Sequence, residues 1–155
     1  MADETPTPAA GAANAQELAL QNIYVKDASF EAPNGPNIPV AEWNPQFNLN
    51  MNTSGATLAA NLHEVVLTIT LEAKVADKVA YLVEVKQGGV FMIRGYADEE
   101  ARRIVGAFCP GVLFPYARSA ISQLVSQGGF PQFLLPPVNF EALYASQTPQ
   151  PAVTN

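Results

Sequence analysis

Few side chains in this sequence combine the type and the spacing that catalysis requires. His63 is the only histidine and Cys109 is the only cysteine, so a multi-histidine metal site and an intramolecular disulfide are both excluded. A strand histidine without a positioned partner is usually a surface residue, and a thiol on an apolar helix is usually an inert small hydrophobe. These two residues therefore predict neither a metal site nor a nucleophile.

Two other groups of residues resemble parts of catalytic or phosphate-binding sites, but each has a simpler explanation or the wrong spacing. The run Asp98-Glu99-Glu100 resembles a set of paired carboxylates, but acidic residues in the first turn of a helix explain all three. The glycines of QGGV at 87–90 lack the spacing of a phosphate-binding loop, and no G-x-S-x-G nucleophile turn occurs. We therefore expect a protein that is not an enzyme and has no cofactor.

The first part of the chain, up to about residue 94, is predicted to form β-strands. Phe47, Leu49 and Met51 alternate with asparagines, which is typical of a half-buried strand. Gly88-Gly89 predicts a bulge or bend in the last strand. A proline-rich segment, 33–45, predicts a long crossing loop after the first strand. Four strands are expected in all, at 23–30, 47–52, 63–75 and 79–94, with the third and fourth joined through 76–78.

After the strands the hydrophobic period becomes helical. Asp98 is a plausible N-cap, and Pro110 and Pro115 predict either one kinked helix or two helices, the second running from about Pro115 to Gly128-Gly129. A short helix is expected at 139–145. One broad apolar stripe comprises Ile104, Phe108, Val112, Ala120 and Leu124 with Val105, Cys109, Leu113, Ala117, Ile121 and Val125. The sequence predicts an α+β fold: a four-stranded antiparallel sheet with a kinked long helix and a short C-terminal helix on one face.

The amino-acid composition and net charge argue against nucleic acid and membranes as binding partners. The 155 residues are 48% hydrophobic but only 14% charged, and the net charge of -6 makes nucleic acid a poor partner. The acidic start lacks the apolar region of a signal peptide, and the uninterrupted apolar runs are too short to span a bilayer. We expect a cytoplasmic protein without direct membrane insertion, with one domain at 16–144 and flexible tails at 1–15 and 145–155.

The apolar excess points to binding. Trp43 lies in the proline-rich loop, where it either covers the core or contacts a partner. The same choice applies to Phe47, Leu49 and Met51, because short helices can leave part of the inner face of a sheet uncovered. From the residues alone, the chain is a non-catalytic α+β domain with more apolar surface than its size requires.

Four segments extend this interpretation: IYVKDASFEAPN, VEVKQGGVFMIRG, GAFCPGVLFPYAR and FPQFLLPPVNFEALY, in this order. Together they resemble the SecB family of bacterial protein-export chaperones from about Gln16 to Tyr144. The motifs FPYAR at 114–118 and PVNF at 137–140 are specific, because neither is a general helix or turn pattern.

The resemblance implies an ATP-independent holdase that binds unfolded preproteins in the cytoplasm, keeps them translocation-competent and delivers them to the SecA motor of the Sec translocase. It implies a homotetramer, a dimer of dimers. The matching client-binding positions are Trp43, Phe47, Leu49 and Met51, and the matching motor-docking positions are Asp27, Glu31, Leu82 and Glu84. Two alternatives stay open: a SecB-like chaperone dedicated to one partner such as an antitoxin, and a non-catalytic carrier of apolar ligands.

Overall fold

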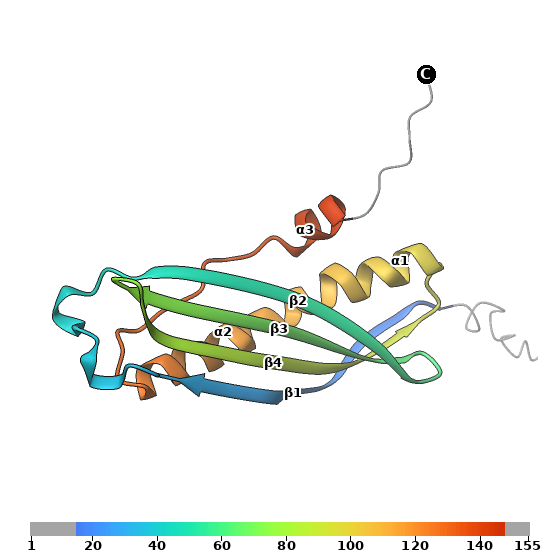
Figure 1. Ribbon diagram of the computed structural model, residues 1–155. Helices are drawn as coiled ribbons and strands as arrows, with labels where there is room; N and C mark the ends of the chain where they lie inside the picture. Colours follow the sequence, from blue (N-terminus) through green and yellow to red (C-terminus); the bar gives the residue numbers. More distant parts are fainter. Residues whose placement is uncertain (1–14, 148–155) are drawn as a thin grey trace, which may run out of the picture.

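The structure, a computed structural model, describes residues 15–147. The tails expected at 1–15 and 145–155 therefore lie almost entirely outside the described residues. Four long strands are followed by one long helical segment and a short helix (Figure 1). The strands are β1 (Glu17–Glu31), β2 (Gln46–Ala59), β3 (Leu62–Val75) and β4 (Lys78–Arg94). The expected α+β fold is confirmed.

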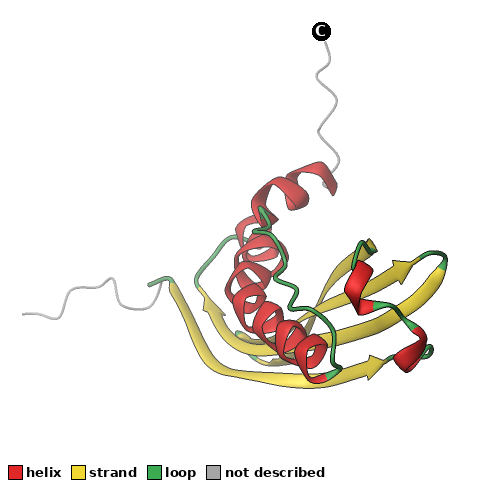
Figure 2. Ribbon diagram, turned by 90° about the vertical axis from the view of Figure 1, so that its left-hand side faces the viewer, coloured by secondary structure: helices red, strands yellow, loops and turns green. Residues whose placement is uncertain are grey.

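The strands form one antiparallel sheet in the order β1-β4-β3-β2, so β1 and β2 are its two edges. All helices longer than one turn lie on the same face of the sheet (Figure 2), which we call the inner face. The predicted alternation of β2 is confirmed, because Phe47, Leu49 and Met51 pair with Ala73, Leu71 and Ile69. Those three β3 residues are fully buried under the helices.

Two connections between strands depend on special backbone conformations. The β3–β4 turn occurs where expected, with positive φ at both Ala76 (49°) and Asp77 (64°), which fits a two-residue hairpin loop. The crossing loop between β1 and β2 contains two single-turn 3-10 helices, η2 (Gly35–Asn37) and η3 (Val40–Glu42). Its Asn34 side chain donates a hydrogen bond of 2.9 Å to the Val79 carbonyl, which fixes the loop against β4.

Of the bulge or bend predicted at Gly88-Gly89, the bulge is absent. The β4 register runs through both glycines without a shift. The β1–β4 pairing shifts between Leu20 and Asn22 and between Val25 and Asp27, and the β3–β4 pairing shifts between Ala73 and Lys74. The glycines make room for side chains: a Cβ on Gly88 would lie 2.5 Å from the Tyr24 ring. On the other face, a Cβ on Gly89 would lie 2.9 Å from the Leu113 side chain.

The long helix is continuous, which decides between the two predictions for Pro110 and Pro115. It comprises α1 (Asp98–Arg103), a π-helical segment η4 (Ile104–Phe108) and α2 (Cys109–Gln127). The Cys109 N–H donates to the Ile104 carbonyl five residues earlier. This wider turn lies just before Pro110, which has no N–H to donate to an α-helical bond. The cap is Ala97 rather than Asp98, which is the first helical residue.

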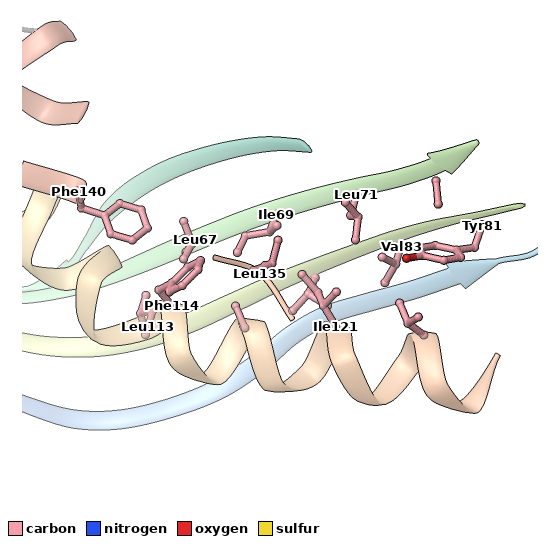
Figure 3. Packing of buried hydrophobic residues seen from close by; sticks show 14 of the residues in the cluster. Leu67, Ile69, Leu71, Tyr81, Val83, Leu113, Phe114, Ile121, Leu135 and Phe140 are labelled. Carbon is pink, nitrogen blue, oxygen red and sulfur yellow. The ribbon is translucent and has the colours of Figure 1, made fainter. Parts of the chain in front are cut away.

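The core lies between this helix and the inner face (Figure 3). One half of the predicted stripe is buried there: Cys109, Leu113, Ala117, Ile121 and Val125 are fully buried. They pack with the inner-facing residues of the central strands, chiefly Leu67, Ile69 and Leu71 of β3 and Tyr81, Val83 and Val85 of β4. Of the other stripe residues, Ile104 is also buried, Phe108 is exposed, and the rest are only partly buried: Val105, Val112, Ala120 and Leu124.

The C-terminal part returns along the same face. The segment 128–139 contributes Phe130 and Leu135 to the core before α3 (Phe140–Gln147) begins. Asn139 precedes α3, and its side-chain oxygen accepts a hydrogen bond of 3.0 Å from the Ala142 N–H. The short helix predicted at 139–145 is thus present and extends two residues further.

Candidate functional site

The apolar side chains predicted for client binding lie on the part of the inner face that the long helix does not cover. Phe47, Leu49 and Met51 all project to this face from the edge strand β2. Leu49 and Met51 are partly buried and pack against the core, whereas Phe47 keeps 42% of its surface exposed. The structure therefore leaves Phe47 as the most accessible apolar group of the three.

Trp43 lies in a cluster of aromatic rings at one end of this strand. Its ring centroid is 5.6 Å from that of Phe130 and 6.4 Å from that of Tyr81. Trp43 is partly buried against the core, so it covers the end of the core. Next to it, Phe47 and Phe133 have centroids 4.4 Å apart. Of the four positions predicted for client binding, Phe47 is therefore exposed, whereas Trp43, Leu49 and Met51 are only partly exposed.

At the other end of β2 the surface deepens into a groove of about 570 Å³. Its floor is formed by β2 from Met51 to Thr57, and its walls are formed by the start of the long helix and by α3. Val105, Phe140, Leu143 and Tyr144 supply apolar wall residues. Sequence reasoning did not assign these helical residues to a binding surface, because their contribution depends on how α3 returns over the sheet. The available signals were Val105 in the apolar stripe and the largely apolar turn at 140–144.

The four positions predicted for motor docking share the opposite, outer face. Asp27 and Glu31 of β1 pair with Lys86 and Leu82 of β4, and Leu82 and Glu84 lie on the same side of β4. Asp27 and Glu31 are exposed, and Leu82 and Glu84 are partly buried. Glu84 also accepts a hydrogen bond of 3.0 Å from the Thr70 hydroxyl. The structure therefore brings the four together on a surface that is separate from the apolar one.

A polar cluster on the outer face joins three strands. Tyr24 of β1 donates its hydroxyl to the Glu64 carboxylate of β3, and Lys26 lies 2.6 Å from the same carboxylate. Desolvation, followed by the hydrogen bond to Glu64, raises the pKa of Tyr24 to about 12. The hydrogen bonds from Lys26 and Tyr24 lower the pKa of Glu64. The cluster thus holds β1 against β3 across Gly88, with Tyr24 neutral and Glu64 charged.

The two residues that could have suggested catalysis lack a reactive setting. His63 has Thr57 as its neighbour, with Oγ1 and Nδ1 3.4 Å apart. Cys109 is fully buried, and desolvation raises the pKa of its thiol to about 12, so the nucleophilic thiolate is disfavoured. Among residues 15–147, no cluster of three or more His, Cys, Asp or Glu side chains could hold a metal ion.

The outward side of the long helix is unusually apolar. Phe108 and Tyr116 are 45% and 50% exposed, and Arg118 is the only charged residue between Ile104 and Gln127. Among residues 15–147, Asp98–Gln127 is the one helix that is long and apolar enough to span a membrane. The sequence-based expectation differed because it counted only uninterrupted apolar runs. A core helix of a globular domain meets the same criteria, and this one packs its buried side on the sheet.

Comparisons with known proteins agree with this geometry. The family model described as preprotein translocase subunit SecB matches residues 11–151. The chain is 51% identical to the protein-export protein SecB of Nitrosococcus oceani over 86% of this chain and 83% of that one. It is 53% identical to the SecB of Marinobacter nauticus over 85% and 80% of the two chains.

A solved structure has a similar fold. The SecB-like chaperone Rv1957 of Mycobacterium tuberculosis, in complex with a ChAD peptide from the HigA1 antitoxin, superimposes with a TM-score of 0.68. It covers 82% of this chain and 92% of its own, at 14% identity. The family match spans all of the described residues, and about half of the aligned residues are identical in the two relatives. The chain therefore belongs to the SecB family of protein-export chaperones.

Proposed function

We propose that this chain is an ATP-independent holdase that binds unfolded preproteins in the cytoplasm, keeps them translocation-competent and delivers them to the SecA motor of the Sec translocase. The observation that carries the proposal is the separation of the two sheet faces. An incompletely covered apolar surface runs along β2 on the inner face, and exposed acidic residues lie on the outer face. A chaperone that holds one partner and docks on another needs two such surfaces.

Client binding would use Trp43, Phe47, Leu49 and Met51. An unfolded chain exposes apolar and aromatic segments, and burying them yields about 25 cal/mol per Å² without reading a specific sequence. Met51 has a flexible side chain that can repack against different clients. A folded protein hides the same segments, so it would compete poorly for this surface.

Motor docking would use Asp27, Glu31, Leu82 and Glu84 on the outer face. Three carboxylates around one leucine favour a basic partner surface with a small apolar contact. Because Asp27 and Glu31 are exposed, salt would screen this contact more than it would weaken apolar client binding. The two activities would therefore differ in their dependence on ionic strength.

We further propose that the chain assembles as a homotetramer, a dimer of dimers. The support is the outward side of the long helix, where Phe108 and Tyr116 are exposed and charges are nearly absent. A monomer rarely leaves such a surface in water, whereas a helix from a second copy would bury it. Several client surfaces on one assembly would then act together on one long client. Sedimentation at micromolar concentration should give four times 16.5 kDa, and a stable monomer would refute the assembly.

The holdase proposal is tested by light scattering. The protein is mixed, without ATP, with several unrelated unfolded preproteins that aggregate on dilution from denaturant. Suppression of aggregation across the panel supports a general export chaperone. Protection of a single client would indicate a dedicated chaperone of the antitoxin type, and saturation by one compact apolar ligand without suppression would indicate a carrier.

A further inference from the structure

We propose that Glu72 of β3 is a further motor-docking residue, and that Leu82 is the centre of the docking surface with a carboxylate on each side of it. The four motor-docking positions of the proposed function all lie on β1 and β4. Glu72 extends that surface by one strand, away from the edge of the sheet. Its role rests on the proposed docking function and specifies the chemistry that the motor must present.

The strand register places Glu72 beside Leu82. β4 lies between β1 and β3, and Leu82 is opposite Glu31 on one side and opposite Glu72 on the other. Paired residues project to the same side of a sheet, so all three side chains lie on the outer face. The helices longer than one turn cover the opposite face (Figure 2). A partner can therefore reach the three side chains together.

The carboxylate of Glu84 is directed towards the same strand as Glu72. Glu84 is two residues from Leu82 on β4, so it also projects outward. The Thr70 hydroxyl of β3 donates a hydrogen bond of 3.0 Å to the Glu84 carboxylate. Thr70 is itself two residues from Glu72 and shares its face of β3. Glu72 and Glu84 therefore form the β3 side of the docking surface together.

The charge of Glu72 is available to a partner. Its side chain is 27% exposed, and its ion-pair partner is Lys74, at 3.5 Å and with 49% of its side chain exposed. An exposed pair of this kind contributes little to folding free energy, because water solvates both charges and the long side chains lose entropy in pairing. A cation of the motor could therefore replace Lys74 without breaking a contact that the fold needs.

The two flanking carboxylates define the chemistry of the partner. Neighbouring strands are about 4.8 Å apart, so Glu31 and Glu72 are separated by about 10 Å across the sheet. A partner surface with an apolar side chain over Leu82 and a lysine or arginine on each side would contact all three residues at once. A partner with a single cation would leave one carboxylate unpaired. The same acidic surface of a second copy would be repelled, so the occupant is the basic motor surface.

Titration of SecA against the full-length protein tests this proposal. Glu72→Gln removes the charge, keeps the size of the side chain and should weaken SecA binding by about two- to fivefold at low salt. The matched control is Glu17→Gln, because Glu17 also forms an exposed outer-face ion pair, with Arg94, but lies at the opposite end of β1 from Glu31. This control should bind SecA like the wild type. Equal losses in the two variants would overturn the proposal, because they would show that only net charge matters.

Lys74 supplies an independent test. If Lys74 and the motor compete for Glu72, Lys74→Met should strengthen SecA binding about twofold in the wild type and leave it unchanged in the Glu72→Gln variant. An equal gain in both backgrounds would contradict a direct contact between Glu72 and the motor. Thermal unfolding and client affinity should be the same in all of these variants. If the wild type itself fails to bind SecA, the proposed docking function fails; if the wild type binds and Glu72→Gln binds equally well, only the role of Glu72 fails.

Discussion

Phe47 offers the sharpest test of the client surface, because it is the most exposed of the apolar positions on β2. The change is Phe47→Ser, which removes the ring and leaves the edge strand without a new charge. A phenylalanine buries on the order of 200 Å² when fully covered, and 42% of Phe47 is exposed. A client that covers the remaining ~80 Å² would gain about 2 kcal/mol. The variant should therefore bind an unfolded client roughly 30-fold more weakly.

The fold should survive this change. The covered part of the ring and its contact with Phe133, at 4.4 Å between centroids, account for up to about 3 kcal/mol of folding free energy. A typical domain has about 5–15 kcal/mol of stability, so the variant should remain folded at room temperature with a lower melting temperature. Replacing Leu49 and Met51 as well would add a greater folding cost, because both pack against the core. The single variant is therefore the more informative one.

The assay measures client affinity by titration and holdase activity by light scattering, with thermal unfolding as the check on folding. The matched control is Leu58→Ser: Leu58 is 54% exposed but lies at the β2–β3 hairpin, and it does not line the groove. It should bind clients like the wild type. Equal affinities of folded Phe47→Ser and wild type would refute the assignment, and an unfolded Phe47→Ser would show that Phe47 is a core residue.

Three further predictions follow from the outer face and the core. Asp27→Lys combined with Glu31→Lys should weaken binding to the motor ATPase by at least about tenfold and leave client affinity unchanged, as measured by titration of each partner; equal losses would contradict separate faces. Burial raises the pKa values of Tyr24 and Tyr81 to about 12, so the stability that these two groups contribute should be fully present below pH 10 and fall between pH 10 and 12, in step with tyrosinate absorbance. Normal titration of Tyr24 and Tyr81 near pH 10 in the folded protein would refute this. The buried Cys109 thiol should react with a thiol reagent only as fast as the protein unfolds, and rapid labelling of the folded protein would contradict its burial.

The fold was predictable wherever the hydrophobic period was clear. The alternation in β2 and β3 predicted strands with the correct inner residues, and the change of period near Asp98 predicted the helix. The same parity placed Asp27, Glu31, Leu82 and Glu84 on one face, as the register confirms. Periodicity is a local property of the chain, so no tertiary information was needed.

The roles of individual glycines and prolines depended on residues far away in the sequence. Gly88 and Gly89 indicated a bulge or bend by local rules, yet their small size is required by Tyr24 on one face and Leu113 on the other. Pro110 is accommodated by a π-helical turn that keeps the helix in one piece. Such outcomes follow from packing, which local sequence rules do not include.

The sequence by itself determined which residues are apolar, on which face each strand residue lies and, through its specific motifs, the family. Only the tertiary structure decided which of those apolar residues stay accessible. Trp43 packs on Phe130 and Tyr81 and is only partly exposed, whereas Phe47 is half exposed, and α3 forms a wall of the groove at the other end of β2. The physical reason is that a side chain's face follows from its position in the strand, but its exposure depends on what distant segments place above it.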